Sequence, residues 1–306
     1  MPSTARIPPD SALSGSEHSK LYRALDTSHL NQNLPYQMTT EIMPISAYEL
    51  FESGSYRASL LTRGPWHPEH QHAGPPIALV CRAIERAAMG HGLTHIARLT
   101  ANLLRPVPIG VVTIEVAIDY VGRNAGHFSA QLIAGGKEVA RFTALAQREN
   151  DVPIPEDLPG HPLPMASKGP DDSIAGVFPF ASKHVGYADL VETRVAHGRL
   201  FDGPCAVWFR LRHPLLASEL PSVYQRVAVA ADSGNGISAI LDLKTYSFVN
   251  SDLTINLLRK PKGEWICLDA RTHLGTNGGG LAESTLYDVH GLVGRATQSL
   301  SVSRRG

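Results

Sequence analysis

The chain has 306 residues, which is enough for two domains of ordinary size or one large domain. Its 28 basic and 28 acidic residues balance to a formal net charge of zero, which argues against nucleic acid as a partner. Cys81, Cys205 and Cys267 lie far apart and form no CxxC motif, so neither a disulfide framework nor a zinc cluster is expected.

No run of apolar residues approaches the roughly 18 to 20 that a membrane span needs, and the N-terminus lacks the apolar core of a signal peptide. We therefore expect a cytoplasmic protein that has no membrane partner. Residues 1–40 are rich in Ser, Pro and charged residues and show little apolar periodicity, so they are expected to form an N-terminal arm.

Residues 41–150 are expected to form a first structural unit. The segment SYRASLLTRG predicts a strand, and a helix is expected near residues 73–90, where Pro75 and Pro76 suit a first helical turn. Strands follow, because TIEVAIDY alternates apolar and polar residues with a period of two. The glycine-bearing turn GRNAG then reverses the chain.

A proline-rich linker is expected at residues 151–175, because VPIPEDLPGHPLP holds five prolines in thirteen residues. Residues 176–306 repeat the order of the first unit, with a strand in AVWFRLRHPL, a helix near residues 219–241 and the glycine-rich turn GTNGGG. That turn joins two strands instead of opening a helix, which argues against a phosphate-binding loop.

The two units are copies of each other. NLLRPVP at residues 102–108 reappears as NLLRKPK at residues 256–262, and both 259 − 105 and 295 − 141 give an offset of 154 between matching arginines. One helix followed by an antiparallel meander, present twice, describes two sheets that each wrap around a helix. The expected fold class is α+β, in the double hotdog arrangement.

Four segments carry a resemblance to a known family: HAGPPIALVCRAIE, ADSGNGIS, SFVNSDLTINLLRKPKGEW and LYDVHGLVGRATQSLSV. Their order and spacing over residues 45–305 resemble the acyl-CoA thioesterase II (TesB-like) family of double hotdog proteins. The resemblance implies hydrolysis of acyl-CoA thioesters, as in fatty acid metabolism, without a cofactor or a metal.

The resemblance also implies that an aspartate, a Thr or Ser and a glutamine hold the attacking water. Asp232 and Gln298 match the first and last of these, and Asn250 stands at the hydroxyl position unless a one-residue shift selects Ser251. Asp232 would act as the general base. Simpler interpretations are a helix end for Asp232, a strand entry for Asn250 and a solvated side chain for Gln298.

The substrate is expected to meet His72 at the mouth of the site, a backbone N–H of Ala73 or Gly74 as oxyanion donor, and Arg259 as a CoA phosphate contact. Arg259 could equally belong to a solvated loop. The triplet His67, His70 and His72 invites a metal interpretation, but no further ligand is signalled.

Subtracting 154 from Asp232, Asn250 and Gln298 gives three apolar residues, namely Ala78, Ile96 and Ala144. We therefore expect one working site per chain. Exposed sheet edges favour a homo-oligomer. Two other functions stay open: an enoyl-thioester hydratase, which would need Asp and His close together, and an acyl-thioester-binding protein without catalysis.

Overall fold

The computed structural model describes residues 42–305, apart from residues 156, 161, 182 and 183. The expected N-terminal arm, residues 1–40, lies outside the described residues. The first half contains β1 (Tyr48–Glu52), β2 (Ser55–Ala58), the 3-10 helix η1 (Leu60–Thr62), α1 (Gly74–Met89), β3 (His95–Leu103), β4 (Val111–Val121), β5 (Ala125–Ala134) and β6 (Lys137–Gln147).

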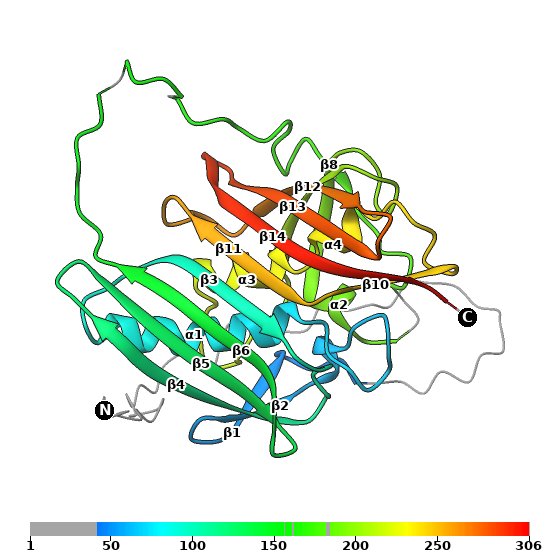
Figure 1. The fold of residues 1–306 in the computed structure, drawn as a ribbon, viewed down its shortest axis with the longest axis horizontal. Helices are drawn as coiled ribbons and strands as arrows, with labels where there is room; N and C mark the ends of the chain where they lie inside the picture. Colours follow the sequence, from blue (N-terminus) through cyan, green and yellow to red (C-terminus); the bar gives the residue numbers. More distant parts are fainter. Residues whose placement is uncertain (1–41, 156, 161, 182–183, 306) are drawn as a thin grey trace.

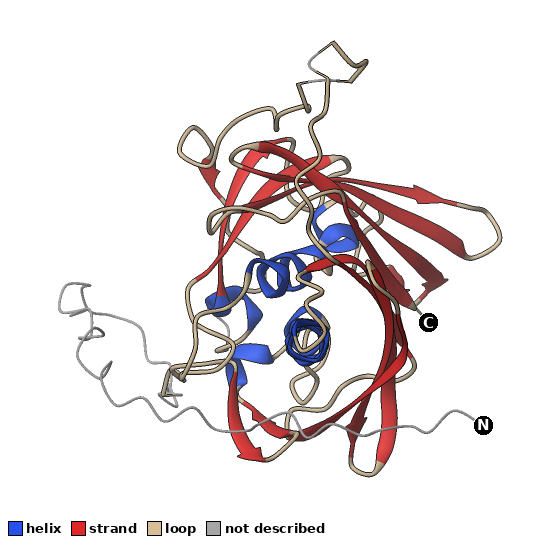
Figure 2. Ribbon diagram, turned by 90° about the vertical axis from the view of Figure 1, so that its left-hand side faces the viewer, coloured by secondary structure: helices blue, strands red, loops and turns tan. Residues whose placement is uncertain are grey.

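The second half contains β7 (Ile174–Ala175), α2 (Tyr187–Leu190), β8 (Val191–His197), β9 (Cys205–Leu211), α3 (Val223–Ala231), α4 (Gly234–Ile237), β10 (Tyr246–Asn250), β11 (Asp252–Leu257), β12 (Ile266–Leu274), β13 (Gly279–Asp288) and β14 (Gly291–Arg304). The described strands form one curved sheet in the order β1-β2-β4-β5-β6-β3-β11-β14-β13-β12-β9-β8-β7, and β10 also pairs with β14. Figure 2 shows the helices inside the curved strands.

The predicted double hotdog is confirmed, because the two halves join edge to edge. β3 pairs antiparallel with β11 in the middle of the molecule (Figure 1), and Thr100 lies opposite Thr254. These residues differ by 254 − 100 = 154 and their hydroxyls are 3.2 Å apart. Equivalent residues of the two copies therefore face each other at the centre of the junction.

The first predicted helix agrees with α1, but the second prediction, residues 219–241, is too long. α3 begins after Ser222, whose hydroxyl accepts from the Gln225 N–H, and it ends at Ala231 with Asp232 as its C-cap. Only the short α4 follows. Gly234 and Gly236 weaken a continuous helix.

The start of α1 lies directly against the end of α3. A Cβ atom on Gly74 would stand 2.6 Å from the Val229 carbonyl oxygen, so only glycine permits this approach. The helix pair is buried: Ile77, Leu79 and Val227 are each at most 1% exposed. This packing brings the segment before α1 to the residues after α3, which positions the site described below.

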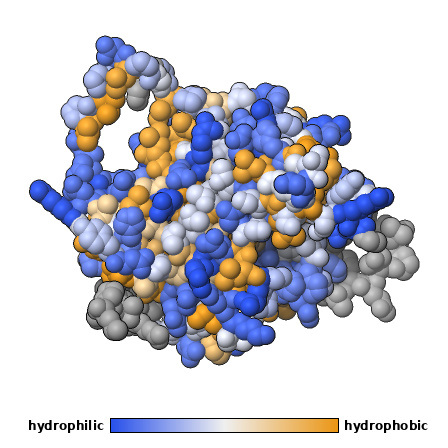
Figure 3. All heavy atoms as spheres, viewed as in Figure 1, coloured by the Kyte–Doolittle hydropathy of each residue, from blue (hydrophilic) through white to orange (hydrophobic). Residues whose placement is uncertain are grey.

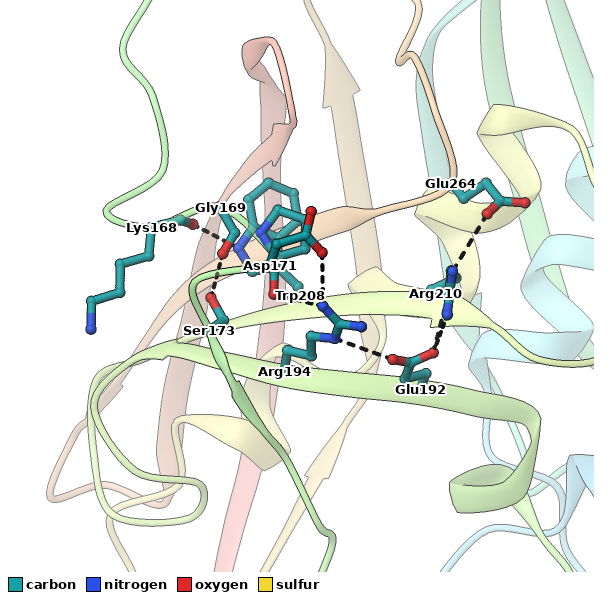
Figure 4. A network of polar contacts seen from close by, with 10 residues as sticks. Lys168, Gly169, Asp171, Ser173, Glu192, Arg194, Trp208, Arg210 and Glu264 are labelled. Carbon is teal, nitrogen blue, oxygen red and sulfur yellow. Dashed lines mark hydrogen bonds and ion pairs between the residues drawn. The ribbon is translucent and has the colours of Figure 1, made fainter.

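The chain between β6 and β7 has no helix or strand among its described residues. Its last part is nevertheless attached to the second half, because Trp208 Nε1 donates to the Lys168 carbonyl at 2.8 Å and Arg194 Nη1 donates to the Pro170 carbonyl at 3.0 Å. Glu192 accepts from both Arg194 and Arg210 and completes this network (Figure 4). The linker boundary at residue 175 stays a prediction.

The outer ends of the sheet are short or covered. β7 has two residues, and the N–H groups of Ala47 and Tyr48 donate to the carbonyls of Pro214 and Leu215 beside β1. On the face seen in Figure 3, hydrophilic and hydrophobic residues are interspersed. The homo-oligomer expected from exposed edges stays a prediction.

Candidate active site

A cavity of about 420 Å³ lies where the start of α1 meets the end of α3. Its lining comes from both halves: from the segment before α1, the loop after β3, the aromatic residues around α2, and the residues that follow α3. Asp232, Asn250 and His72 all line it. The site therefore belongs to the junction between the halves.

Asp232 is the centre of a polar cluster and is 5% exposed. Asn250 Nδ2 donates to Asp232 Oδ1 at 2.9 Å, and Gln298 Nε2 lies 3.5 Å from the same oxygen and 3.2 Å from the Asp232 carbonyl. The structure thus brings together the three residues that the family resemblance implied as one set. A carboxylate with two amide donors can bind water and accept its proton.

A shift in strand register separates Asn250 from Ser251, the two candidates for the middle position of the set. In the first half, the register between β3 and β6 shifts between Ile96 and Arg98. At the equivalent position of the second half, Ser251 separates β10 from β11. Ser251 pairs through its backbone N–H with the Ser299 carbonyl, and its side chain is exposed. Asn250 is therefore the side chain that reaches Asp232.

Gln298 is fixed by contacts on both ends of its amide. It is 2% exposed, which excludes the alternative of a solvated side chain. Its Oε1 accepts from the Asn235 N–H at 2.9 Å, so its Nε2 must point toward Asp232. A Cβ atom on Gly234 would stand 3.1 Å from this Oε1, which explains one glycine of the SGNG stretch.

His72 lies closer to the centre of the site than expected. Its Nδ1 is 3.0 Å from Asp232 Oδ2. Its ring stacks on Tyr187, with centroids 3.7 Å apart. The Tyr187 hydroxyl contacts the Val229 carbonyl at 2.9 Å and the Ser233 hydroxyl at 2.8 Å. Sequence reasoning missed Tyr187, which has no motif of its own.

Tyr187 stays a neutral phenol. Burial raises its pKa far above the ordinary value, and the nearby Asp232 charge adds to this effect. A neutral phenol gives His72 a flat apolar surface and holds the end of α3 through its hydroxyl. The ring therefore fixes the plane of the His72 imidazole beside Asp232.

The two candidate oxyanion donors differ in the structure. The Gly74 N–H lies 3.2 Å from His72 Nδ1 and is engaged there. Within the described chain no acceptor is found for the Ala73 N–H, and Ala73 lines the cavity. Ala73 is therefore the better placed of the two donors.

Arg259, expected at the substrate, lies outside the cavity lining. Its Nη atoms contact both carboxylate oxygens of Asp288 at 2.6 Å, and its Nε donates to the Leu292 carbonyl at 3.0 Å. The Arg259 side chain pairs with the carboxylate of Asp288, which is 0% exposed. Arg105, the equivalent residue of the first copy, lines the cavity instead.

The three histidines of the triplet do not lie together in the structure. His67 and His70 stack on each other with centroids 4.1 Å apart, whereas His72 faces Asp232. No group of three or more His, Cys, Asp or Glu side chains suited to a metal ion is found among the described residues.

Aromatic rings form one wall of the cavity. Phe178 and Phe180 are stacked 5.0 Å apart, and Phe201 meets each of them edge-on at 6.3 Å. Phe201 has a φ of 62°, which is unfavourable for a bulky residue, and its N–H is held by the Ile237 carbonyl at 3.1 Å. This wall offers an apolar surface beside Asp232.

The opposite end of the helix pair carries another acid. Glu85 of α1 accepts from the Ser222 hydroxyl at 2.7 Å at the start of α3, much as Asp232 meets His72 at the start of α1. The offset of 154 residues pairs Asp232 with Ala78, but Ala78 does not occupy the equivalent place at this end. The offset would start the second helix at 74 + 154 = 228, whereas α3 begins at Val223. Burial raises the pKa of Glu85 to about 7.

The fold and the site together define a double hotdog protein with a polar site at the junction between its halves. The acyl-CoA thioesterase N-terminal domain family matches residues 62–147, and the acyl-CoA thioesterase C-terminal domain family matches residues 155–302. The chain belongs to the acyl-CoA thioesterase family and is a thioesterase.

Solved structures share the fold. A putative thioesterase II from Thermobifida fusca YX has a TM-score of 0.66 at 14% identity, covering 85% of this chain and 96% of that chain. A putative thioesterase from Novosphingobium aromaticivorans DSM 12444 has a TM-score of 0.62 at 18% identity, covering 83% of this chain and 98% of that chain. Acyl-CoA thioesterase II TesB2 from Mycobacterium marinum has a TM-score of 0.60 at 18% identity, covering 85% of this chain and 96% of that chain.

Comparison with curated proteins finds no match. Of the helices in the described part of the chain, none has the length and apolar character needed to cross a membrane.

Proposed function

We propose that the chain hydrolyses acyl-CoA to a free acid and CoA, with a water molecule held by Asp232, Asn250 and Gln298. The observation that carries this proposal is the convergence of the Asn250 and Gln298 amides on Asp232 Oδ1, at 2.9 and 3.5 Å. Two amide donors fix the carboxylate, and Asn250 lines the cavity beside it, whereas the Gln298 amide is engaged at both ends. The acyl-CoA substrate follows from the family.

In this mechanism Asp232 takes a proton from the water as its oxygen attacks the thioester carbonyl carbon. The carbonyl π electrons move to the oxygen, and the Ala73 N–H donates to that oxyanion. When the intermediate collapses, the carbon–sulfur bond breaks, and the proton on Asp232 passes to the leaving sulfur to give the CoA thiol. The carboxylate is restored at the end of the cycle.

His72 is a positioning residue in this proposal. Its contact at 3.0 Å occupies Asp232 Oδ2, so Oδ1 is the oxygen that meets the two amides. The stack on Tyr187 prevents rotation of the ring. The carboxylate is thereby held at a fixed angle to the cavity.

Thiol release from a series of acyl-CoAs tests the proposal, with purified parent protein and the Asp232→Asn variant. Steady turnover by the parent and its loss in the variant support the proposal. Binding of acyl-CoA without turnover by the parent would instead favour a non-catalytic acyl-thioester-binding protein.

A second candidate is hydration of an enoyl thioester, because His72 and Asp232 form the close Asp–His pair that such a reaction needs. The two reactions have different products, since hydration adds water to the carbon–carbon double bond and releases no thiol. Incubation with an enoyl-CoA and its saturated counterpart separates them. Loss of the enoyl absorbance without thiol release would favour the hydratase.

A further inference from the structure

Charge is distributed unevenly over the cavity lining. Among the lining residues in the described chain, the Lys, Arg, Asp and Glu side chains are Arg105, Arg305 and Asp232. Both arginines are exposed, whereas Asp232 is 5% exposed. The exposed charges of the lining are therefore cationic, and the buried carboxylate lies at the proposed reaction centre.

The guanidinium of Arg305 is anchored by one edge. Its Nε lies 3.0 Å from the Leu243 carbonyl and 3.2 Å from the Tyr246 carbonyl, and its backbone N–H donates to the Thr245 carbonyl at 2.8 Å. Within the described chain neither Nη atom has a partner. The charge is thus fixed in place while its two Nη groups are free for an anion.

Arg105 is held in a similar way. Its Nη1 donates to the Glu138 carbonyl at 2.7 Å, and its backbone N–H donates to the Val139 carbonyl at 3.1 Å. The Glu138 carboxylate also faces this group, but Arg141 already binds both of its oxygens at 2.8 and 2.7 Å. Nε and Nη2 of Arg105 have no partner in the described chain.

An exposed aromatic ring also borders the cavity. Trp66 is 56% exposed and meets Phe248 edge-on, with centroids 6.3 Å apart. Tryptophan supplies a flat surface on which a nucleotide base or an extended chain can lie. Two held guanidinium groups and an exposed indole therefore line the same cavity.

We propose that this rim, formed by Trp66, Arg105 and Arg305, binds the phosphate-bearing nucleotide end of CoA, with the two arginines as phosphate contacts. The inference rests on the proposed function, because the thioester must lie at Asp232 for the nucleotide to reach the rim. Guanidinium groups match phosphate geometry and form charge-assisted hydrogen bonds with it. Arg105 thus takes the role that the sequence assigned to its repeat counterpart Arg259.

Two thioesters with the same acyl group test the proposal: acyl-CoA and the acyl thioester of N-acetylcysteamine, which lacks the phosphates and the nucleotide. In Arg105→Gln and Arg305→Gln, we expect KM for acyl-CoA to rise about three- to tenfold each, with kcat little changed. KM for the short thioester should stay at the parent value. Added salt should raise KM for acyl-CoA alone.

Arg304→Gln is the matched control, since Arg304 is an exposed neighbour that does not line the cavity. Equal KM changes for both thioesters, or no change for either, would overturn the proposal. The proposal would also be overturned if the arginine variants hydrolysed an acyl-carrier-protein thioester less well but acyl-CoA as well as the parent does. The rim would then recognise a protein surface.

A binding measurement separates this inference from the proposed reaction. Calorimetric titration of the full chain with CoA needs no turnover, and the affinity should fall about three- to tenfold in each arginine variant. Parent protein that binds CoA through these arginines but releases no thiol would refute only the reaction. If the parent turns over acyl-CoA and both arginine variants keep its affinity for CoA, only the assignment of the rim as the nucleotide site is refuted.

Discussion

His72 Nδ1 lies 3.0 Å from Asp232 Oδ2, although the two residues are 232 − 72 = 160 positions apart in the chain. The contact exists because Gly74 lets the start of α1 approach the Val229 carbonyl of α3. The two copies of the hotdog unit thus each contribute one member of a single polar pair.

Asp232→Asn should lower kcat by at least about a hundredfold, because it keeps the shape of the side chain and removes the base. The melting temperature should change little, since an amide at this position can still accept from Asn250. Thiol release and thermal unfolding measure the two effects. Asp172→Asn, an exposed change, is the control. Activity within a few-fold of the parent would place the base elsewhere.

His72→Asn should retain more activity than His72→Ala if the imidazole acts through its polar contact with Asp232. An asparagine amide can keep a polar contact with Asp232 Oδ2, whereas alanine leaves this oxygen without the contact. We expect a kcat loss of about tenfold or more for alanine and a smaller one for asparagine, with KM affected less. Equal losses in the two variants would indicate a role for His72 beyond positioning.

Gln298→Ala should lower kcat by about ten- to a hundredfold and destabilise the fold by roughly 1 to 3 kcal/mol, because it leaves the buried Asn235 N–H without its acceptor. Ala144→Ser, at the counterpart position in the first copy, should affect kcat far less. Steady-state kinetics and urea unfolding give the two quantities. A larger kcat loss at residue 144 would contradict the asymmetry between the copies.

A non-hydrolysable thioether analogue of acyl-CoA should bind with a stoichiometry of one per chain. Glu85 at the opposite end of the helix pair is in contact with Ser222 and does not line the cavity. Isothermal titration calorimetry measures the stoichiometry directly. Two equal sites per chain would contradict the asymmetry between the copies.

Glu85→Gln should stabilise the protein at neutral and alkaline pH. The pKa of Glu85 is about 7 in the folded chain, above the ordinary value of roughly 4.3 for an unfolded chain. Its contribution to stability is therefore fully present below about pH 4 and lost as the pH rises through about 7.

The variant should remove this loss, which we place on the order of 1 to 3 kcal/mol, and urea unfolding between about pH 5 and pH 8 measures it. Glu264→Gln, at a side chain 65% exposed, is the control. An unchanged pH dependence of unfolding in Glu85→Gln would contradict the prediction.

The sequence by itself determined the duplication, the double hotdog and the first helix, because strand alternation, helix starts and turn glycines are local signals that each copy repeats. The resemblance to the acyl-CoA thioesterase II family also implied Asp232 and Gln298 as site residues. The second helix was overestimated, since the apolar pattern continues past Asp232 although Gly234 and Gly236 interrupt the helix.

Only the tertiary structure decided which side chains meet. The register shift at Ser251 turns Asn250 toward Asp232, and the packing of α1 on α3 brings His72 to the same carboxylate. The same 154-residue repeat leaves Arg105 at the cavity and pairs Arg259 with the buried Asp288. Periodicity along a chain fixes which face of an element is buried, but contacts between distant segments depend on strand register and helix packing, which no local pattern encodes.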